Sequence, residues 1–183
     1  MINPKSIVTA FVAAALGTMS LTAASMATKP QVNKIPNGIE TTVNGNEISL
    51  QFYTPSTIRV VKHPAGVSAE EKSLAVTATP QDVTTTVRTT GNSAEIKSDR
   101  LRARLDLRDG SISFFDNKGK TIVKEDRGPV FTPIQDAGKP STMAKQSFRL
   151  DKEEAIYGLG NLENGKLSQR NVSRLLQPGN VED

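Results

Sequence analysis

The sequence predicts an all-β protein built as an antiparallel β-sandwich. Beyond residue 40, apolar residues recur at every second position in most segments, which is the period of a half-buried strand. Clusters of Gly, Pro, Asn and Asp separate these segments at short intervals. After the first 27 residues, no stretch has the period of an amphipathic helix. The 183 residues are enough for one domain with its own core.

The first 27 residues predict a secretory signal peptide. Lys5 makes the start positively charged, residues 7–21 are apolar and rich in alanine, and small residues lead up to Ala27. We expect cleavage after Ala27 and export to the periplasm or the outside of a bacterial cell. The apolar run is short and contains a glycine, so we expect no membrane span.

The remaining chain divides into three predicted parts. Residues 28–40 are rich in proline and amides, which indicates a flexible leader. Residues 41–160 are expected to form the β-sandwich domain, and residues 161–183 a loop that starts a connection to a further domain. Within the sandwich, residues 128–142 contain three prolines and are expected to form an exposed loop.

The first strands follow from alternation and from β-branched residues. Residues 46–53 place Ile48, Leu50 and Phe52 on one face. Further short strands or β-branched runs are expected at residues 57–62, 74–79, 83–88, 94–98 and 146–150.

The clearest hairpin lies between residues 101 and 124. Residues 101–108 alternate apolar with charged side chains, and Asp109-Gly110 predicts a two-residue turn into residues 111–115. Residues 116–119 predict the next turn, which leads into residues 120–124. Charges on one face and leucines on the other are typical of a sheet with one solvated side.

Composition excludes several functional classes. The chain has no cysteine and a single histidine, His63, so it offers no thiol chemistry and no histidine cluster for a metal. We therefore expect no cofactor, and we interpret His63 as a surface residue. The net charge is only +4, the basic residues are scattered among acidic ones, aromatic content is 4% and Trp is absent. Nucleic acid is therefore not an expected partner.

The carboxylates do not predict an active site in this chain alone. Catalysis by a carboxylate pair needs two carboxyl groups that face each other across the substrate. The adjacent acids here would point to opposite faces of a strand, and we interpret them as solvated turn residues. Without a neighbouring histidine, no serine has a Ser-His relay. The acidic pairs are Glu70-Glu71, Glu125-Asp126, Glu153-Glu154 and Glu182-Asp183.

Four segments, in order, resemble the amino-terminal, galactose-mutarotase-like domain of glycoside hydrolase family 31. The first is "FYTPSTIRV" at residues 52–60, and the second is the hairpin at residues 101–124. The most specific is "FRLDKEEAIYGLG" at residues 148–160. The tail, residues 166–171 and 179–183, is similar to bacterial members of the α-xylosidase and α-glucosidase type. The resemblance covers roughly residues 40–183.

The resemblance implies that this chain is the front portion of a larger enzyme. In the family, a (β/α)8 barrel follows the sandwich and carries two catalytic aspartates that act by a retaining mechanism. This sequence has neither the barrel units nor the Trp-containing nucleophile motif, so we expect the chain to be inactive alone. The implied partners are the catalytic barrel and an α-linked oligosaccharide.

The resemblance also implies a role for the glycines at the end of the sandwich. In the family, the loops after Tyr-Gly-Leu-Gly reach the mouth of the active site. Gly158 and Gly160 are expected to let the backbone bend sharply toward it. Asp183 is the residue expected to contact substrate, and Glu182 is its close rival because the register of the tail is not fixed.

A second class of function stays open on the sequence. The chain is also compatible with an exported sandwich that binds carbohydrate or protein without belonging to a hydrolase. The small number of aromatic residues weakens this alternative, because sugar-binding sandwiches usually present exposed aromatic rings.

Overall fold

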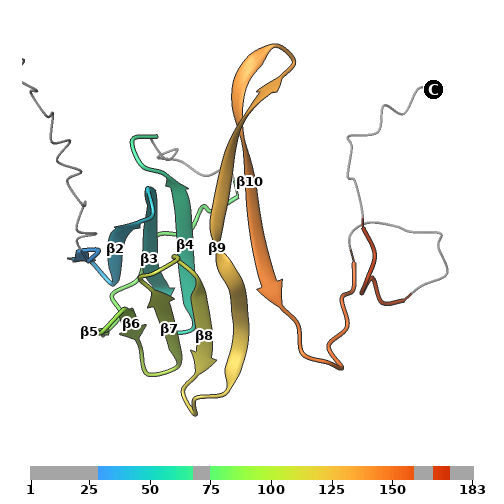
Figure 1. Ribbon diagram of the computed structural model, residues 1–183. Helices are drawn as coiled ribbons and strands as arrows, with labels where there is room; N and C mark the ends of the chain where they lie inside the picture. Colours follow the sequence, from blue (N-terminus) through green and yellow to red (C-terminus); the bar gives the residue numbers. More distant parts are fainter. Residues whose placement is uncertain (1–28, 68–74, 159–166, 174–183) are drawn as a thin grey trace, which may run out of the picture.

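The computed structural model describes residues 29–67, 75–158 and 167–173, which contain strands and no helix. One antiparallel sheet has the order β1-β2-β3-β4, and the other has the order β10-β9-β8-β7-β6-β5 (Figure 1). The smaller sheet comprises β1 (Val32–Ile35), β2 (Gly38–Val43), β3 (Asn46–Thr54) and β4 (Thr57–Pro64). The larger sheet comprises β5 (Thr86–Thr90), β6 (Ser93–Lys97), β7 (Leu101–Asp106), β8 (Ile112–Asp116), β9 (Thr121–Asp136) and β10 (Lys139–Arg149).

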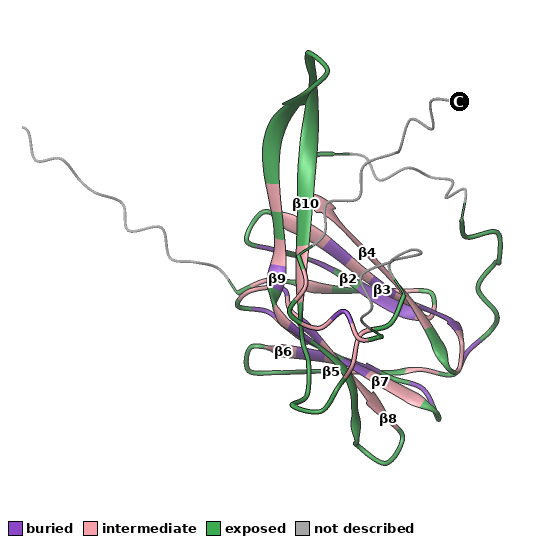
Figure 2. Ribbon diagram, turned by 90° about the vertical axis from the view of Figure 1, so that its right-hand side faces the viewer, coloured by how far each residue is buried: buried purple, intermediate pink, exposed green. Residues whose placement is uncertain are grey.

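The two sheets enclose one hydrophobic core, so the predicted all-β sandwich is confirmed. Buried residues lie in strands of both sheets (Figure 2) and form one hydrophobic cluster. Apolar and outward residues alternate along β2, β3, β6 and β7. The sequence predicts this alternation for β3 and β7. The fully buried side chains of the core are Ile39, Val43, Ile48, Leu50, Phe52, Ala94, Ile96, Ala103, Leu105 and Ile112.

The leader expected at residues 28–40 is wrong over most of its length. Val32–Ile35 forms β1 and pairs with β2, which begins at Gly38. Pro36 and Asn37 make the turn between them, and Asn37 adopts a positive φ of 55°. Proline followed by a residue that tolerates positive φ reverses the chain tightly, so the prolines and amides mark a turn here.

Two finer predictions in the middle of the chain also need correction. The described part of the strand expected at residues 74–79 is not a strand, and the strand expected at residues 83–88 begins only at Thr86, as β5. Residues 75–85 cross from the smaller sheet to the larger one. Gln81 N–H donates to Tyr53 O at 2.9 Å, a contact outside any strand ladder. Asp106 N–H donates to Ser111 O at 2.8 Å, so residues 107–110 form a four-residue loop. Asp109-Gly110 is the second half of this loop and not a two-residue turn.

Residues 128–142 form most of a long hairpin, so the predicted exposed loop is wrong. Beyond residue 124, β9 pairs with β10 and no longer with β8, and the two strands project from the sandwich as a ribbon (Figure 1). Pro133 pairs with Thr142 and Pro140 with Gln135, which are alternate pairs of the ladder. At such positions a missing N–H faces out of the ribbon, so proline breaks no ladder bond.

Candidate docking surface at the end of the sandwich

The inner face of the larger sheet is left uncovered at its β9–β10 end. β8 and β9 pair Phe114 with Val123, and paired residues share a face. Phe114 packs against the core, so Val123 lies on the core side, yet it is 40% exposed. Phe148, opposite Glu125 in the ladder, is 54% exposed. The smaller sheet ends at β4, so within the described ranges neither sheet places a layer over these side chains.

These residues line an open groove of about 690 Å³ between the β9–β10 end and the chain that follows it. We call its apolar lining the apolar seam. Lys124, Arg149, Asp151 and Glu154 form its charged rim. An apolar strip with a polar border is the usual anatomy of a protein-protein contact. The apolar seam consists of Ile122, Val123, Phe148, Leu150 and Ile156.

The chain leaves β10 through a turn that is held by one arginine. Glu154 N–H donates to Asp151 O at 3.1 Å, and Asp151 N–H donates to Glu154 Oε2 at 2.9 Å. Arg170 Nη1 donates to the carbonyl oxygens of both residues, at 2.8 and 2.6 Å. Gln169 is buried, and its N–H donates to Ile156 O at 2.7 Å. Residues 167–173 therefore fold against this turn and fix one wall of the groove.

Gly158 has the bend that the sequence predicts. Its φ is +90°, and a Cβ placed on it would meet no atom within 4 Å. The glycine is thus needed for backbone conformation, and close packing plays no part. Tyr157, just before it, is exposed beside the apolar seam. Gly160 lies outside the described residues.

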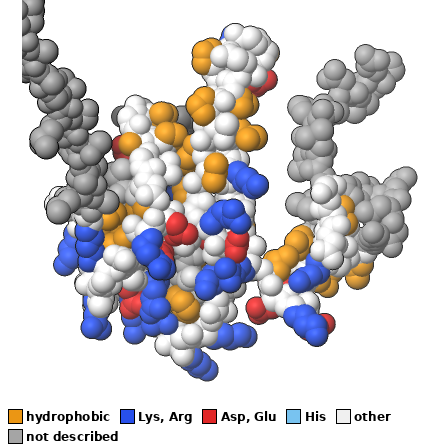
Figure 3. Space-filling view, in the orientation of Figure 1, with side chains coloured by type: hydrophobic (Ala, Val, Ile, Leu, Met, Phe, Trp, Pro, Cys, Tyr) orange, Lys and Arg blue, Asp and Glu red, His pale blue; other side chains and the backbone are white. Residues whose placement is uncertain are grey.

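The β9–β10 ribbon carries a second apolar surface. In the register, Met143 pairs with Thr132, and Val130 and Ile134 lie two residues to either side of Thr132 on β9. Alternation therefore puts Val130, Ile134 and Met143 on one face, where they are 39–49% exposed. Hydrophobic side chains gather on the ribbon, whereas Lys and Arg gather over the lower part of the molecule (Figure 3).

A buried ion pair joins the two sheets. Lys62 Nζ on β4 donates to both oxygens of Glu125 on β9, at 2.7 and 2.6 Å, and to Gln146 Oε1 at 3.0 Å. Glu125 Oε2 also accepts the Ile112 N–H at 2.7 Å. Burial raises the pKa of Glu125, and the hydrogen bonds from Lys62 and Ile112 offset this only in part. The interpretation of Glu125 as a solvated turn acid is therefore wrong.

The other described acids of the adjacent pairs make separate contacts. Asp126 accepts hydrogen bonds from exposed Arg127 and Arg149, on the other side of the strand from Glu125. Glu153 is exposed, and Glu154 serves the turn after β10. Asp183 and Glu182, the expected substrate-contacting residues, lie outside the described residues, as do Glu70 and Glu71.

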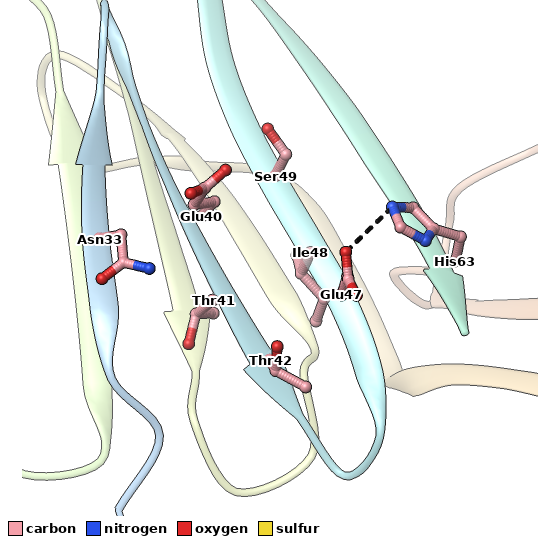
Figure 4. A pocket seen from close by; sticks show the side chains of 8 residues that line it. All are labelled: Asn33, Glu40, Thr41, Thr42, Glu47, Ile48, Ser49 and His63. Carbon is pink, nitrogen blue, oxygen red and sulfur yellow. Dashed lines mark ion pairs between the residues drawn. The ribbon is translucent and has the colours of Figure 1, made fainter. Parts of the chain in front are cut away.

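A polar pocket of about 180 Å³ lies on the outer face of the smaller sheet (Figure 4). His63 Nε2 is 3.7 Å from Glu47 Oε2 across this pocket, and Glu40 and Ser49 project from the neighbouring strands. Within the described ranges, no three His, Cys, Asp or Glu side chains are placed to share a metal ion. His63 is half-buried in this pocket, so its interpretation as a plain surface residue needs correction.

Comparison with known proteins now assigns the chain to a family. The sequence profile of the glycosyl hydrolase 31 N-terminal galactose mutarotase-like domain matches residues 47–175. The chain belongs to this family. The GH31 α-xylosidase from Xanthomonas citri is a similar solved structure, with 29% sequence identity and a TM-score of 0.68. The match covers 75% of this chain and 16% of that one, so the chain spans a small part of the length of that enzyme.

Membership of the GH31 amino-terminal domain family confirms the resemblance found in the sequence. The sequence motif at residues 148–160 overlaps the end of β10 and the exit turn. The apolar seam was not predicted, although its residues Phe148, Leu150 and Ile156 stand in that motif. In the part of the chain that the structure describes, no helix is long and apolar enough to cross a bilayer.

Proposed function

We propose that this chain is the amino-terminal accessory domain of an exported GH31 α-glycosidase, of the α-xylosidase or α-glucosidase type. The intact enzyme hydrolyses O-glycosyl bonds in α-linked oligosaccharides with retention of configuration. The domain breaks no bond itself, and it packs against the catalytic barrel and shapes the entrance to the active site.

The apolar seam is the observation that carries this proposal. Fully burying one large aliphatic or aromatic side chain stabilises a protein by about 1.5–3 kcal/mol relative to leaving it in water. Val123 and Phe148 are 40% and 54% exposed, so a large part of that stabilisation is unused in this domain. A surface of the same polypeptide is the occupant we propose, because the similar α-xylosidase has most of its length beyond the matched region.

The exit turn supports the same arrangement. Arg170 holds the turn at Asp151 and Glu154, and the positive φ of Gly158 bends the backbone two residues after Ile156 of the seam. The segment that continues from Gly158 thus starts at the proposed contact with the barrel. We propose that the tail ends at the substrate, with Asp183 or its rival Glu182 as the acid that contacts sugar hydroxyls.

A domain exchange tests this function. Residues 29–183 would replace the matching part of the Xanthomonas citri α-xylosidase, and turnover of an aryl α-xyloside and an aryl α-glucoside would be measured. We expect the chimera to be active and the isolated chain to be inactive. Turnover by the isolated chain, or a folded chimera without activity towards both substrates, would contradict the proposal.

A seam variant identifies the contact. Phe148→Ser should lower the melting temperature of the chimera by several degrees more than that of the isolated chain. Val67→Ser is the matched control, because Val67 is 52% exposed and does not line the groove. Equal effects of Phe148→Ser in the chimera and in the isolated chain would exclude the seam as the contact with the barrel.

A further inference from the structure

A row of cationic side chains crosses the outer face of the larger sheet from edge to edge. The registers of five neighbouring strand pairs link one residue on each of the six strands. Paired residues point to the same face, and Arg104 is exposed whereas its neighbours Ala103 and Leu105 are buried, so this face is the outer one. From β5 to β10 the residues are Arg88, Glu95, Arg104, Ser113, Lys124 and Arg149.

The next row along the strands adds two more cations. Lys97 pairs with Arg102, and Arg102 pairs with Phe115. The two rows together hold six cationic side chains and one carboxylate, Glu95. We call these six residues the basic face: Arg88, Lys97, Arg102, Arg104, Lys124 and Arg149. Asp126, which accepts from Arg149 at 2.9 Å, is the acid at the β10 end.

The arginines at the centre of the basic face are held in place. The guanidinium carbons of Arg102 and Arg104 lie 4.6 and 5.5 Å from the ring centroid of Phe115. Glu95 Oε2 accepts from Arg104 at 3.1 Å and lies 3.8 Å from Arg102 Nε. Arg102 Nε is buried and makes no hydrogen bond. Stacking and one shared carboxylate thus fix two guanidinium groups and leave most of their N–H donors unused.

A groove of about 490 Å³ runs along this part of the face. Its charged lining is Arg88, Arg102 and Arg104 against Glu95, and its remaining lining is the hydroxyl-bearing Thr90 and Ser93. Arginine forks match carboxylate and sulfate groups in two-point contacts, and hydroxyl groups suit the hydroxyls of sugars. The groove therefore offers both kinds of contact that an acidic sugar requires.

We propose that the basic face binds a linear anionic polysaccharide, one that carries carboxylate or sulfate groups along its length. Adjacent strands are about 4.8 Å apart, so a row over six strands is far longer than a single small anion. On this face of the strands that form the rows, Phe115 is the aromatic residue, and two guanidinium groups lie over it. A stacking platform for nucleic-acid bases is therefore not available.

The choice of polysaccharide also rests on the proposed function, because an exported glycosidase works among glycans. The face lies on the opposite side of the sheet from the core and from Val123 and Phe148. Lys124 and Arg149 of the basic face also form the rim of the groove at the apolar seam, whereas Arg88, Lys97, Arg102 and Arg104 lie on β5, β6 and β7 and do not line that groove. The part of the basic face on these three strands and the apolar seam can thus be occupied at the same time. The role we infer is retention of the enzyme on a charged polymer.

Binding of the chain to polygalacturonate, an uncharged dextran of similar length and single-stranded DNA tests the proposal. We expect binding to polygalacturonate that weakens steeply with added salt, weaker binding to DNA, and none to dextran. Arg88→Ser/Arg104→Ser/Lys124→Ser should weaken polygalacturonate binding by about tenfold or more, because each cation near a polyanion contributes to affinity. All three side chains are exposed, so the variant should stay folded.

The matched control removes the same charge elsewhere. Lys34→Ser/Lys139→Ser/Lys145→Ser changes three exposed lysines that lie outside the basic face. Equal loss in both variants would show a non-specific charge effect and overturn the proposal. Absence of binding to polygalacturonate at low salt, or tighter binding to DNA, would also overturn it. None of these results bears on the GH31 α-glycosidase function, which the domain exchange tests separately.

Discussion

Lys62 and Glu125 form an ion pair between the two sheets of the sandwich, with Nζ 2.6 Å from Oε2 and side chains only 9% and 6% exposed. The pair stands where β9 leaves β8 to form the ribbon, so Ile112 N–H on β8 donates to Glu125 instead of to a strand carbonyl. One carboxylate therefore satisfies a buried backbone donor and a lysine from the other sheet. The pair closes the side of the sandwich next to the uncovered seam.

Removal of the lysine should destabilise the domain strongly. Lys62→Met leaves the buried Glu125 carboxylate without its cation, and breaking such a pair from one side costs about 3–5 kcal/mol. The free energy of unfolding, measured with urea, would show the loss. Arg149→Met is the control, since it breaks an exposed pair with Asp126 worth less than about 1 kcal/mol. Equal losses of unfolding free energy in the two variants would show that the buried pair between the sheets contributes no more than the exposed pair.

The raised pKa of Glu125 predicts a pH dependence of stability. Between its ordinary pKa and its raised value, this carboxyl binds more protons in the folded than in the unfolded state. The free energy of unfolding attributed to Glu125 therefore falls as pH rises through that window. In Glu125→Gln this fall should be absent, although the variant is less stable at neutral pH. Urea unfolding at several pH values from about 4 to 7 would measure it.

Asp106 provides a comparison of opposite sign. Hydrogen bonds from Arg108 hold the pKa of Asp106 below its usual value. Its stabilising contribution is present above the ordinary pKa of Asp and is lost as pH falls toward the lowered value. Asp106→Asn should therefore reduce the loss of stability in acid. If the unfolding free energy of Asp106→Asn changed with pH in parallel with that of the wild type, the lowered pKa of Asp106 would be contradicted. The same result for Glu125→Gln would contradict the raised pKa of Glu125.

Local alternation explains why much of the sandwich could be predicted. In residues 46–53 and 101–107 the apolar period of two directly reports which face is buried, and the structure places Leu50, Phe52 and Leu105 in the core. The family could be predicted from short motifs, because the turns and the exit at Tyr157-Gly158 are local features. Phe148 and Gly158 both stand in the motif at residues 148–160 that carries the resemblance.

The rest depends on which strands become neighbours, and local sequence does not contain that information. Glu125 is followed by Asp126 and Arg127, so it reads as part of a solvated turn, and its burial comes from Lys62, which is 63 residues away. The basic face shows the same effect. Its cations alternate with apolar or acidic residues along each strand, and only the register collects them on one side. Pro133 predicts a loop from sequence alone, because only the pairing with the partner strand shows that its missing N–H faces out of the ribbon.

The seam predicts an unusual contrast between two phenylalanines. Phe52 is fully buried, and Phe52→Ala should cost about 3–5 kcal/mol of unfolding free energy. Phe148→Ala should cost less than about 1 kcal/mol in the isolated chain, because Phe148 is more than half exposed. Urea denaturation of both variants measures the difference. A large loss in Phe148→Ala would mean that the seam is already packed and would remove the basis for a docked partner.

Two glycines predict different outcomes for the same substitution. A Cβ on Gly128 would lie 1.6 Å from the carbonyl oxygen of Asp109, so the loop between β7 and β8 would have to move away from β9. We expect Gly128→Ala to lower the free energy of unfolding by about 1–3 kcal/mol or more.

Gly158→Ala meets no neighbouring atom and changes only the cost of a positive φ, about 1 kcal/mol and confined to the exit from β10. In the isolated chain it should leave the urea midpoint almost unchanged, because Gly158 lies outside both sheets. In the domain exchange it should reduce turnover, because the chain beyond Gly158 would leave the seam in another direction. A variant that unfolds at lower urea without loss of turnover would show that the bend serves the sandwich and not the docked barrel.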